Sequence, residues 1–204
     1  MEVTQNKIII SPLTYIKSIM YFQRFSSDLL EEGDYKFAYA LLLGFIDNIE
    51  NEILITDFIP IKNFDVNYIK FEQYDKLFEN IEKLNQEFSD DELPEYILGW
   101  ARNSIHNDLE PTIFDKENHI LFQTAIHPNS VFWIFNFDNL MVDDGFRLFS
   151  FKDDFKIINI TSELIELNYS FSKEVYFDDL VQIAIDIEEK RKNKEVLIKG
   201  LEEN

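Results

Sequence analysis

Residues 37–46 read FAYALLLGFI, a continuous apolar run that includes Gly44. A run of this length without alternation of polar and apolar side chains predicts a strand that is buried on both faces of a sheet. Burial of both faces requires a layer of structure on each side, and helical patterns precede and follow the run. The sequence therefore predicts an α/β fold in which a mixed sheet is flanked by helices.

The other expected elements lie on both sides of this run. Strands are expected at residues 53–61, 96–100, 131–137 and 146–151, with one or two more within 156–171. Helices are expected from Ser11-Pro12 to about residue 30, over residues 68–88 and 111–125, and from 173 to about 201. Residues 101–110 are expected to form a polar loop. In the first helix, Leu13, Ile16 and Met20 follow one amphipathic stripe, and the other apolar side chains spread around it.

Composition excludes several classes of protein. The chain has 204 residues, no cysteine, and 39 Asp and Glu against 19 Lys and Arg, which gives a formal charge of −20. Without cysteine there is no disulfide framework, no Cys-based zinc site and no thiol nucleophile. The charge argues against nucleic acids and anionic membranes as direct partners, because both require Lys and Arg. The first residues carry no signal-peptide pattern, so we expect a cytoplasmic protein.

Four short stretches carry a resemblance to a known domain: ALLLG at residues 40–44, YILGW at 96–100, PNSV at 128–131 and GFRLF at 145–149. In this order, and after a first helix, they resemble the MPN domain, the fold of the JAMM metallo-isopeptidases and of their non-catalytic relatives. The resemblance covers residues 8–152 and implies an MPN-like fold, of the cytidine-deaminase-like type. Residues 153–204 would then form a C-terminal extension of one or more strands and a long helix, which packs on this domain or on a partner.

The resemblance also implies where a metal site would lie. Active members hold one zinc with His-x-His and an Asp, and a Glu handles the proton of the metal-bound water. Counted from Gly44 and Trp100, the Glu position falls on Phe37, the His positions on Arg102 and Ser104, and the Ser-x-x-Asp positions on Thr112 and Asp115. Arg102 could pair with Asp115 and replace the ion electrostatically. These departures imply a domain without metal, cofactor or isopeptidase activity.

In the family, members without the metal serve as scaffolds. The resemblance therefore implies an interaction subunit that pairs with another MPN protein, in an assembly like the proteasome lid, the COP9 signalosome or translation initiation factor 3. The first and last helices are candidates for this contact, because such helices can pack in a bundle with a partner. The side chains expected in it are Tyr15, Ile19, Phe22, Phe25, Leu180, Ile183 and Ile187, unless they are buried against the chain's own sheet.

Two other functions stay open at this stage. His106, Asp108, Glu110 or His119 could hold a relocated metal ion together with Asp115, which would make the chain a metalloprotease or deubiquitinase. Alternatively, Trp100 could line a groove that binds a ubiquitin-like protein without any chemistry. The simpler interpretations are solvated loop residues for the first set and a core tryptophan for the second.

Overall fold

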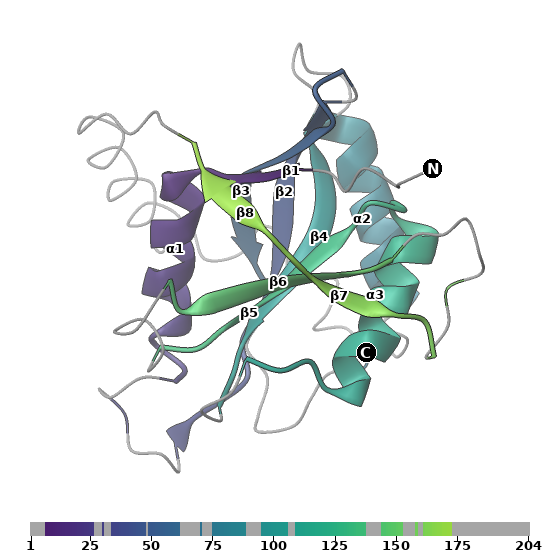
Figure 1. Ribbon diagram of the computed structural model, residues 1–204. Coiled ribbons are helices and arrows are strands. Elements are labelled where there is room, and N and C mark those ends of the chain that lie inside the picture. The colour runs from purple at the N-terminus through teal and green to yellow at the C-terminus, as the bar shows by residue number, and fades with distance from the viewer. Residues whose placement is uncertain are drawn as a thin grey trace.

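The fold is organised around one mixed sheet (Figure 1). The computed structural model describes residues 7–26, 30, 34–47, 49–61, 70, 75–88, 95–105, 109–137, 144–152, 158 and 161–172. The strands are Lys7–Ile10 (β1), Tyr39–Asp47 (β2), Glu52–Pro60 (β3), Tyr96–Asn103 (β4), Val131–Phe135 (β5), Phe146–Phe151 (β6), Leu164–Leu167 (β7) and Tyr169–Phe171 (β8). The helices are Pro12–Phe22 (α1), Asp75–Phe88 (α2) and Ile113–Ala125 (α3). The predicted α/β class is confirmed.

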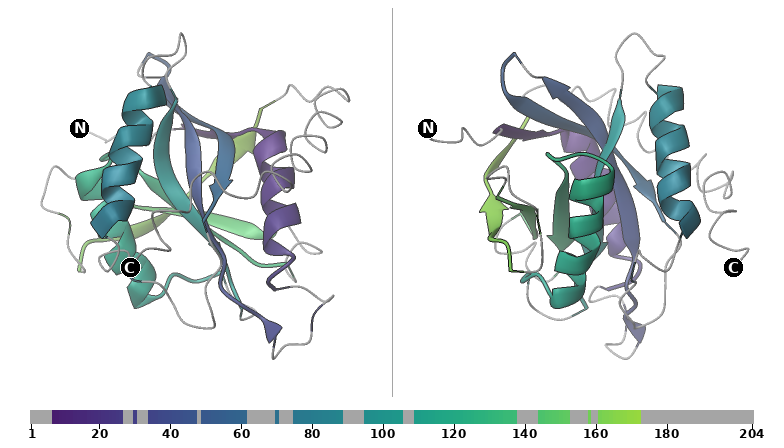
Figure 2. Two further views of the ribbon diagram at one scale, coloured as in Figure 1. Left: turned by 180° about the vertical axis from the view of Figure 1, so that it is seen from behind. Right: turned by 90° about the vertical axis from the view of Figure 1, so that its right-hand side faces the viewer.

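The apolar run forms β2 in the interior of the sheet, whose strand order is β7-β6-β5-β4-β2-β3-β1-β8. Its side chains alternate between two hydrophobic clusters. Ala40 and Leu42 belong to the cluster that contains Phe22 of α1. Tyr39 and Leu41 belong to the cluster that contains the apolar side chains of α2 and α3. The sheet therefore lies between α1 on one face and α2 with α3 on the other (Figure 2).

Two glycines of the sequence motifs allow neighbouring strands to approach closely. A Cβ atom added to Gly44 would lie 1.9 Å from the carbonyl oxygen of Leu54, at a register shift between β2 and β3. A Cβ atom added to Gly99 would lie 1.8 Å from the carbonyl oxygen of Val131. Both positions consequently require a residue without a side chain.

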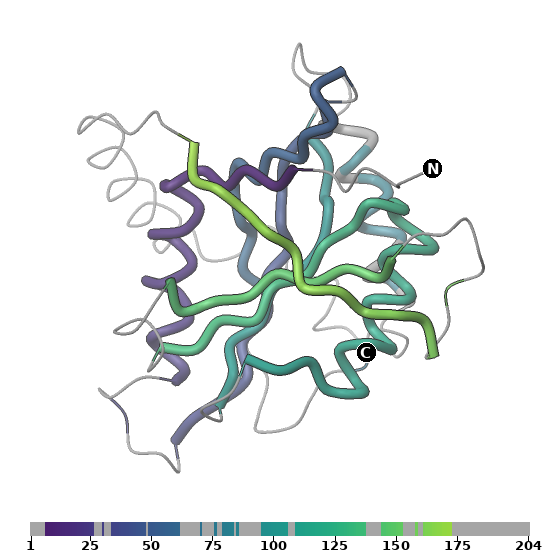
Figure 3. The backbone as a smooth tube through the Cα atoms, in the orientation of Figure 1, coloured from purple at the N-terminus to yellow at the C-terminus, as the bar shows by residue number. Residues whose placement is uncertain are grey.

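The two edge strands of the sheet, β7 and β8, are consecutive in the chain. β7 pairs antiparallel with β6 at one end, and β8 pairs parallel with β1 at the other end. Only Asn168 lies between β7 and β8, so the sheet must curve until its ends come close together. Figure 3 shows this segment running across the front of the molecule from one end of the sheet to the other. The segment is part of the same sheet, and it lies in the region after residue 152 where the sequence expected one or more further strands.

Three expectations about elements differ from the structure. β1 was not expected, because a strand of four residues is too short to show a periodic pattern. Residues 101–103 belong to β4 and are buried, where the sequence predicted a polar loop. α1 ends at Phe22, well before residue 30, because the chain turns there and the carbonyl oxygen of Phe25 accepts a hydrogen bond from the Lys36 amide at 2.8 Å.

The helix expected at residues 173–201 lies outside the described residues. Within the described part, no helix has both the length and the apolar character needed to cross a lipid bilayer.

Candidate functional site

Four of the five positions that the sequence assigned to a degenerate metal site lie together in the structure. Phe37 lies two residues before β2, Arg102 lies on β4, Thr112 is the N-cap of α3, and Asp115 lies in its first turn. Arg102 hydrogen bonds to Asp115, Thr112 hydrogen bonds to Asp115, and the Arg102 guanidinium lies 5.8 Å from the centre of the Phe37 ring. Residues that are 65 positions apart in the chain, at 37 and 102, are thereby brought into one buried cluster.

The central contact is a bidentate ion pair, which the sequence had suggested. Arg102 Nε donates to Asp115 Oδ1 at 2.7 Å, and Nη2 donates to Oδ2 at 2.6 Å. Both side chains are 1% exposed, so the pair is removed from water. A third guanidinium nitrogen, Nη1, donates to the carbonyl oxygen of Asn103 at 3.0 Å. The planar guanidinium matches the carboxylate with two parallel hydrogen bonds, a geometry that lysine cannot provide.

Asp115 also fixes the start of α3. Its Oδ2 accepts hydrogen bonds from the backbone amide and the hydroxyl of Thr112, both at 2.7 Å. In return, the Asp115 amide donates to Thr112 Oγ1 at 3.3 Å, which completes a reciprocal N-terminal cap. The carboxylate thus pairs with the amide of the N-cap residue and places a negative charge near the positive end of the helix dipole. One side chain ties α3 to β4.

These residues do not fit a catalytic zinc ion. The carboxylate oxygens of Asp115 already accept four hydrogen bonds, three of them at Oδ2. The nearest charged group is a guanidinium, which repels a metal cation and cannot ligate it. Phe37 has no group that can accept a proton, where catalysis would need a carboxylate. The cluster can therefore hold the fold together, but it offers neither a metal ligand set nor a general base.

Ser104 and Asn103 belong to the same corner. Ser104 is buried just after β4, and its amide donates to the carbonyl oxygen of Phe135 at 2.6 Å. The buried side chain of Asn103 makes three hydrogen bonds. The sequence did not predict this role, because residues 101–110 were expected to form a polar loop. Its Oδ1 accepts from the Ala38 amide at 2.7 Å, and its Nδ2 donates to Ser26 Oγ at 2.7 Å and to the carbonyl oxygen of Lys36 at 2.9 Å. Asn103 thereby positions the residues on both sides of Phe37.

The residues suggested for a relocated metal site are not brought together where they can be described. His106 and Asp108 lie outside the described residues, and Glu110 is exposed. His119 is fully buried on α3, and among the described residues no group of three His, Asp or Glu side chains is arranged to hold a metal ion. Burial lowers the pKa of His119 to about 3, and the Ser130 backbone opposes this only in part. Neither ring nitrogen makes a hydrogen bond of good geometry.

Trp100 is a core residue. Its side chain is 0% exposed and stacks on Phe132, with 4.9 Å between the ring centres. It therefore cannot line a surface groove for a ubiquitin-like protein.

The contact surface expected on α1 is largely the face that α1 turns toward its own sheet. Phe22 is 0% exposed and stacks on Phe135, so it cannot contact a partner. Tyr15, Ile19 and Phe25 are partly buried against the same core cluster. The corresponding residues of the last helix, Leu180, Ile183 and Ile187, lie outside the described residues.

A salt bridge lies on the inward face of α1. Lys17 is 9% exposed, and its ammonium group pairs with Asp57 of β3 at 2.8 Å. The spacing of Leu13, Ile16 and Met20 did not indicate which way this stripe faces, and in the structure the stripe is left partly exposed.

Comparisons with known proteins do not show a family for this chain. Neither a scan against protein-family models nor a search of curated proteins gave a match to the chain.

Proposed function

We propose that the protein is a non-catalytic interaction module of the MPN type, which serves as a scaffold subunit beside another MPN protein. The observation that carries the proposal is the Arg102–Asp115 ion pair. The resemblance assigns these two residues, by motif spacing alone, to the positions of a lost zinc site. That they meet in the interior, with Phe37 against the guanidinium, supports a common origin of this corner with the metal centre of the family.

The chemistry of the cluster supports the loss of activity in the proposal. A guanidinium stays protonated at all physiological pH values, so it supplies a fixed positive charge where an active member would hold an ion. That charge compensates Asp115 in the protein interior without an exchangeable ligand. A domain without the metal can still bind other proteins through its surface. The formal charge of −20 favours a partner whose contact surface is basic.

The proposal is tested by affinity capture of the tagged full-length chain from its own cells, followed by mass spectrometry. The expected result is one MPN protein with an intact His-x-His motif at near-stoichiometric yield. A tagged, unrelated protein of similar size and charge is the control, because it reports capture by acidity alone. A monomeric mass in solution, together with no stoichiometric partner in the captured material, would overturn the proposal. So would metal-dependent isopeptidase activity of the purified chain that Asp115→Asn abolishes.

A further inference from the structure

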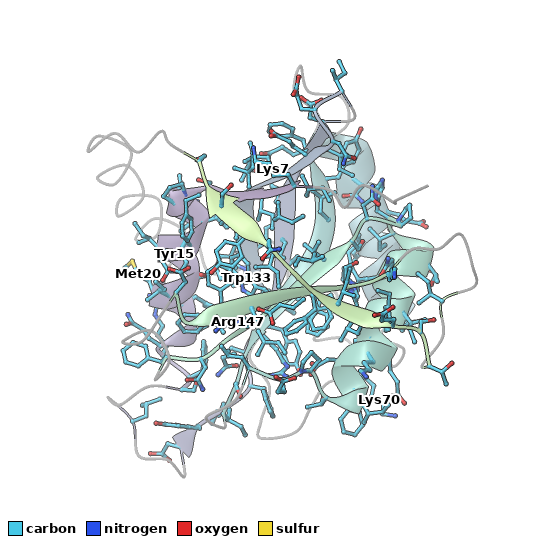
Figure 4. The ribbon with its side chains drawn as sticks, in the orientation of Figure 1. Lys7, Tyr15, Met20, Lys70, Trp133 and Arg147 are labelled. Atoms are coloured by element: carbon cyan, nitrogen blue, oxygen red, sulfur yellow. The ribbon has the colours of Figure 1, made fainter. Side chains whose placement is uncertain are left out.

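α1 carries an apolar stripe on the side that faces away from the sheet. Leu13, Ile16 and Met20 follow i, i+3, i+7 spacing, so they lie on one face of the helix. All three are partly exposed, and none belongs to the side chains that pack against the two core clusters of the described residues. Figure 4 shows Met20 on the outer side of α1, while Tyr15 lies on the side of the sheet. Three neighbouring apolar side chains on one helix form a surface that association would cover.

The described chain ends beside this helix. The amide of Ser172, just after β8, donates to the carbonyl oxygen of Ile10 at 3.0 Å. Ile10 is followed by Ser11, the residue that precedes α1. The ring of Phe171 lies 5.1 Å from the ring of Tyr15 in the second turn of α1. Because β8 runs parallel to β1, the chain leaves the described region at the same end of α1 at which that helix begins.

The remaining residues, 173–204, carry a stripe that matches the one on α1. Leu180, Ile183 and Ile187 repeat the i, i+3, i+7 spacing of Leu13, Ile16 and Met20. Leu180 lies eight positions after Ser172, and a fully extended chain covers up to about 27 Å over that stretch. α1 has 11 residues and is therefore roughly 16 Å long. The segment can thus reach either end of the outer face of α1.

We propose that the segment after Ser172 folds back on its own chain, with residues 180–190 as an amphipathic helix whose Leu180, Ile183 and Ile187 cover Leu13, Ile16 and Met20 of α1. The attachment of the segment next to α1 favours its own chain over a second molecule, since the tether gives a high effective concentration. The inference places Leu180, Ile183 and Ile187 in a contact within one chain, where the sequence analysis considered them for a partner contact, so it is tested separately from the scaffold role.

Cross-linking tests the contact directly, because the native chain has no cysteine. The middle residues of the two stripes, Ile16 and Ile183, face each other whether the helices run parallel or antiparallel. Packed helix axes lie about 8–10 Å apart, within reach of a short thiol–thiol cross-linker. The full-length Ile16→Cys, Ile183→Cys variant is expected to cross-link within one chain, with a yield that does not depend on protein concentration. The matched control is Ile16→Cys with Ile185→Cys, which places the second thiol on the opposite side of a helix.

Each other outcome of this experiment counts against the inference. Cross-links between chains would show that a second copy covers the stripe. Equal yields for the Ile183 and Ile185 variants would show that the segment has no helical face, and no cross-link in either would show that it does not dock.

Hydrogen exchange of the full-length chain gives a second readout. Ile183→Asp should speed the exchange of α1 amides by about tenfold, since a buried apolar contact is lost, and Ile185→Asp should leave it unchanged. Identical α1 exchange in both variants would overturn the docking, while the partner captured from cells would still decide the scaffold role separately.

Discussion

Arg102 is a charged residue with 1% exposure. Its burial is tolerated because its guanidinium is fully paired with the Asp115 carboxylate. Taking two charges out of water costs several kcal/mol for each, and the attraction offsets this cost only with good geometry and additional hydrogen bonds. The bidentate contact, the Asn103 carbonyl and the Thr112 cap supply these. The pair therefore acts as one unit, and removing either half leaves a buried group without compensation.

This coupling is measurable with a double-mutant cycle. Arg102→Met and Asp115→Asn should each lower the free energy of unfolding by about 3–5 kcal/mol, because each leaves one buried partner uncompensated. The double variant should lose clearly less than the two single losses combined, since no unpaired charge remains. Chemical denaturation of the four proteins checks this expectation. Additive losses would mean that the two side chains do not interact in solution.

His119 makes the stability depend on pH. Its pKa is lowered from 6.5 to about 3 by burial against the rings of Phe132 and Phe151, so the folded protein excludes the proton that the unfolded chain binds. The stabilisation is complete above pH 6.5 and is lost progressively as the pH falls toward 3. Between pH 7 and pH 5 we expect His119 to contribute a loss of about 2 kcal/mol.

The variant His119→Leu should lose most of this dependence between pH 7 and pH 5, as measured by urea denaturation at each pH. His127 is the matched control. Partial burial lowers the pKa of His127 as well, so His127→Asn should remove only a smaller part of the slope. An unchanged slope in the His119→Leu protein would contradict a buried, neutral His119.

At the scale of elements, the close approach of strands depends on glycine. A methyl group at Gly99 would meet the carbonyl oxygen of Val131 on β5, so β4 and β5 would have to separate. Gly99→Ala should therefore lower the free energy of unfolding by about 1–3 kcal/mol or more. Ile49→Ala, at a turn where the side chain is 92% exposed, should change stability by less than about 0.5 kcal/mol. Equal thermal midpoints for both variants would contradict the tight strand pairing.

The sequence predicted the elements with strong patterns and missed those that depend on distant partners. The apolar run of β2 and the hairpin partner β6 were placed correctly, because their burial is evident in local composition. Residues 101–103 were assigned to a loop, because Arg102 and Asn103 become core residues only through Asp115 and Ser26. The sequence also did not indicate that Lys17 lies on the inward face of α1, since the burial of Lys17 depends on Asp57. In the candidate site, motif spacing predicted which residues meet, but not that Asp115 also caps α3.

At the scale of the whole molecule, the segment that forms β7 and β8 joins both ends of the sheet. A chain that ends at residue 152 would leave β6 and β1 without these partners. We therefore expect residues 1–152 to be unfolded or aggregated and residues 1–172 to be folded, as judged by circular dichroism and by the dispersion of NMR signals. A folded 1–152 fragment would show that β7 and β8 are not needed to complete the sheet, which would contradict this expectation.

The central proposal is that Phe37, Arg102, Ser104 and Asp115 occupy the positions of a lost metal site, and the zinc content of a reconstructed site tests it most directly. The variant Phe37→Glu, Arg102→His, Ser104→His places the residues of an active MPN metal site around Asp115. Elemental analysis after dialysis should give about one zinc per chain, and adding Asp115→Asn should remove it, while the native chain carries none. A folded triple variant without zinc, or stoichiometric zinc in the native chain that depends on Asp115, would contradict the account.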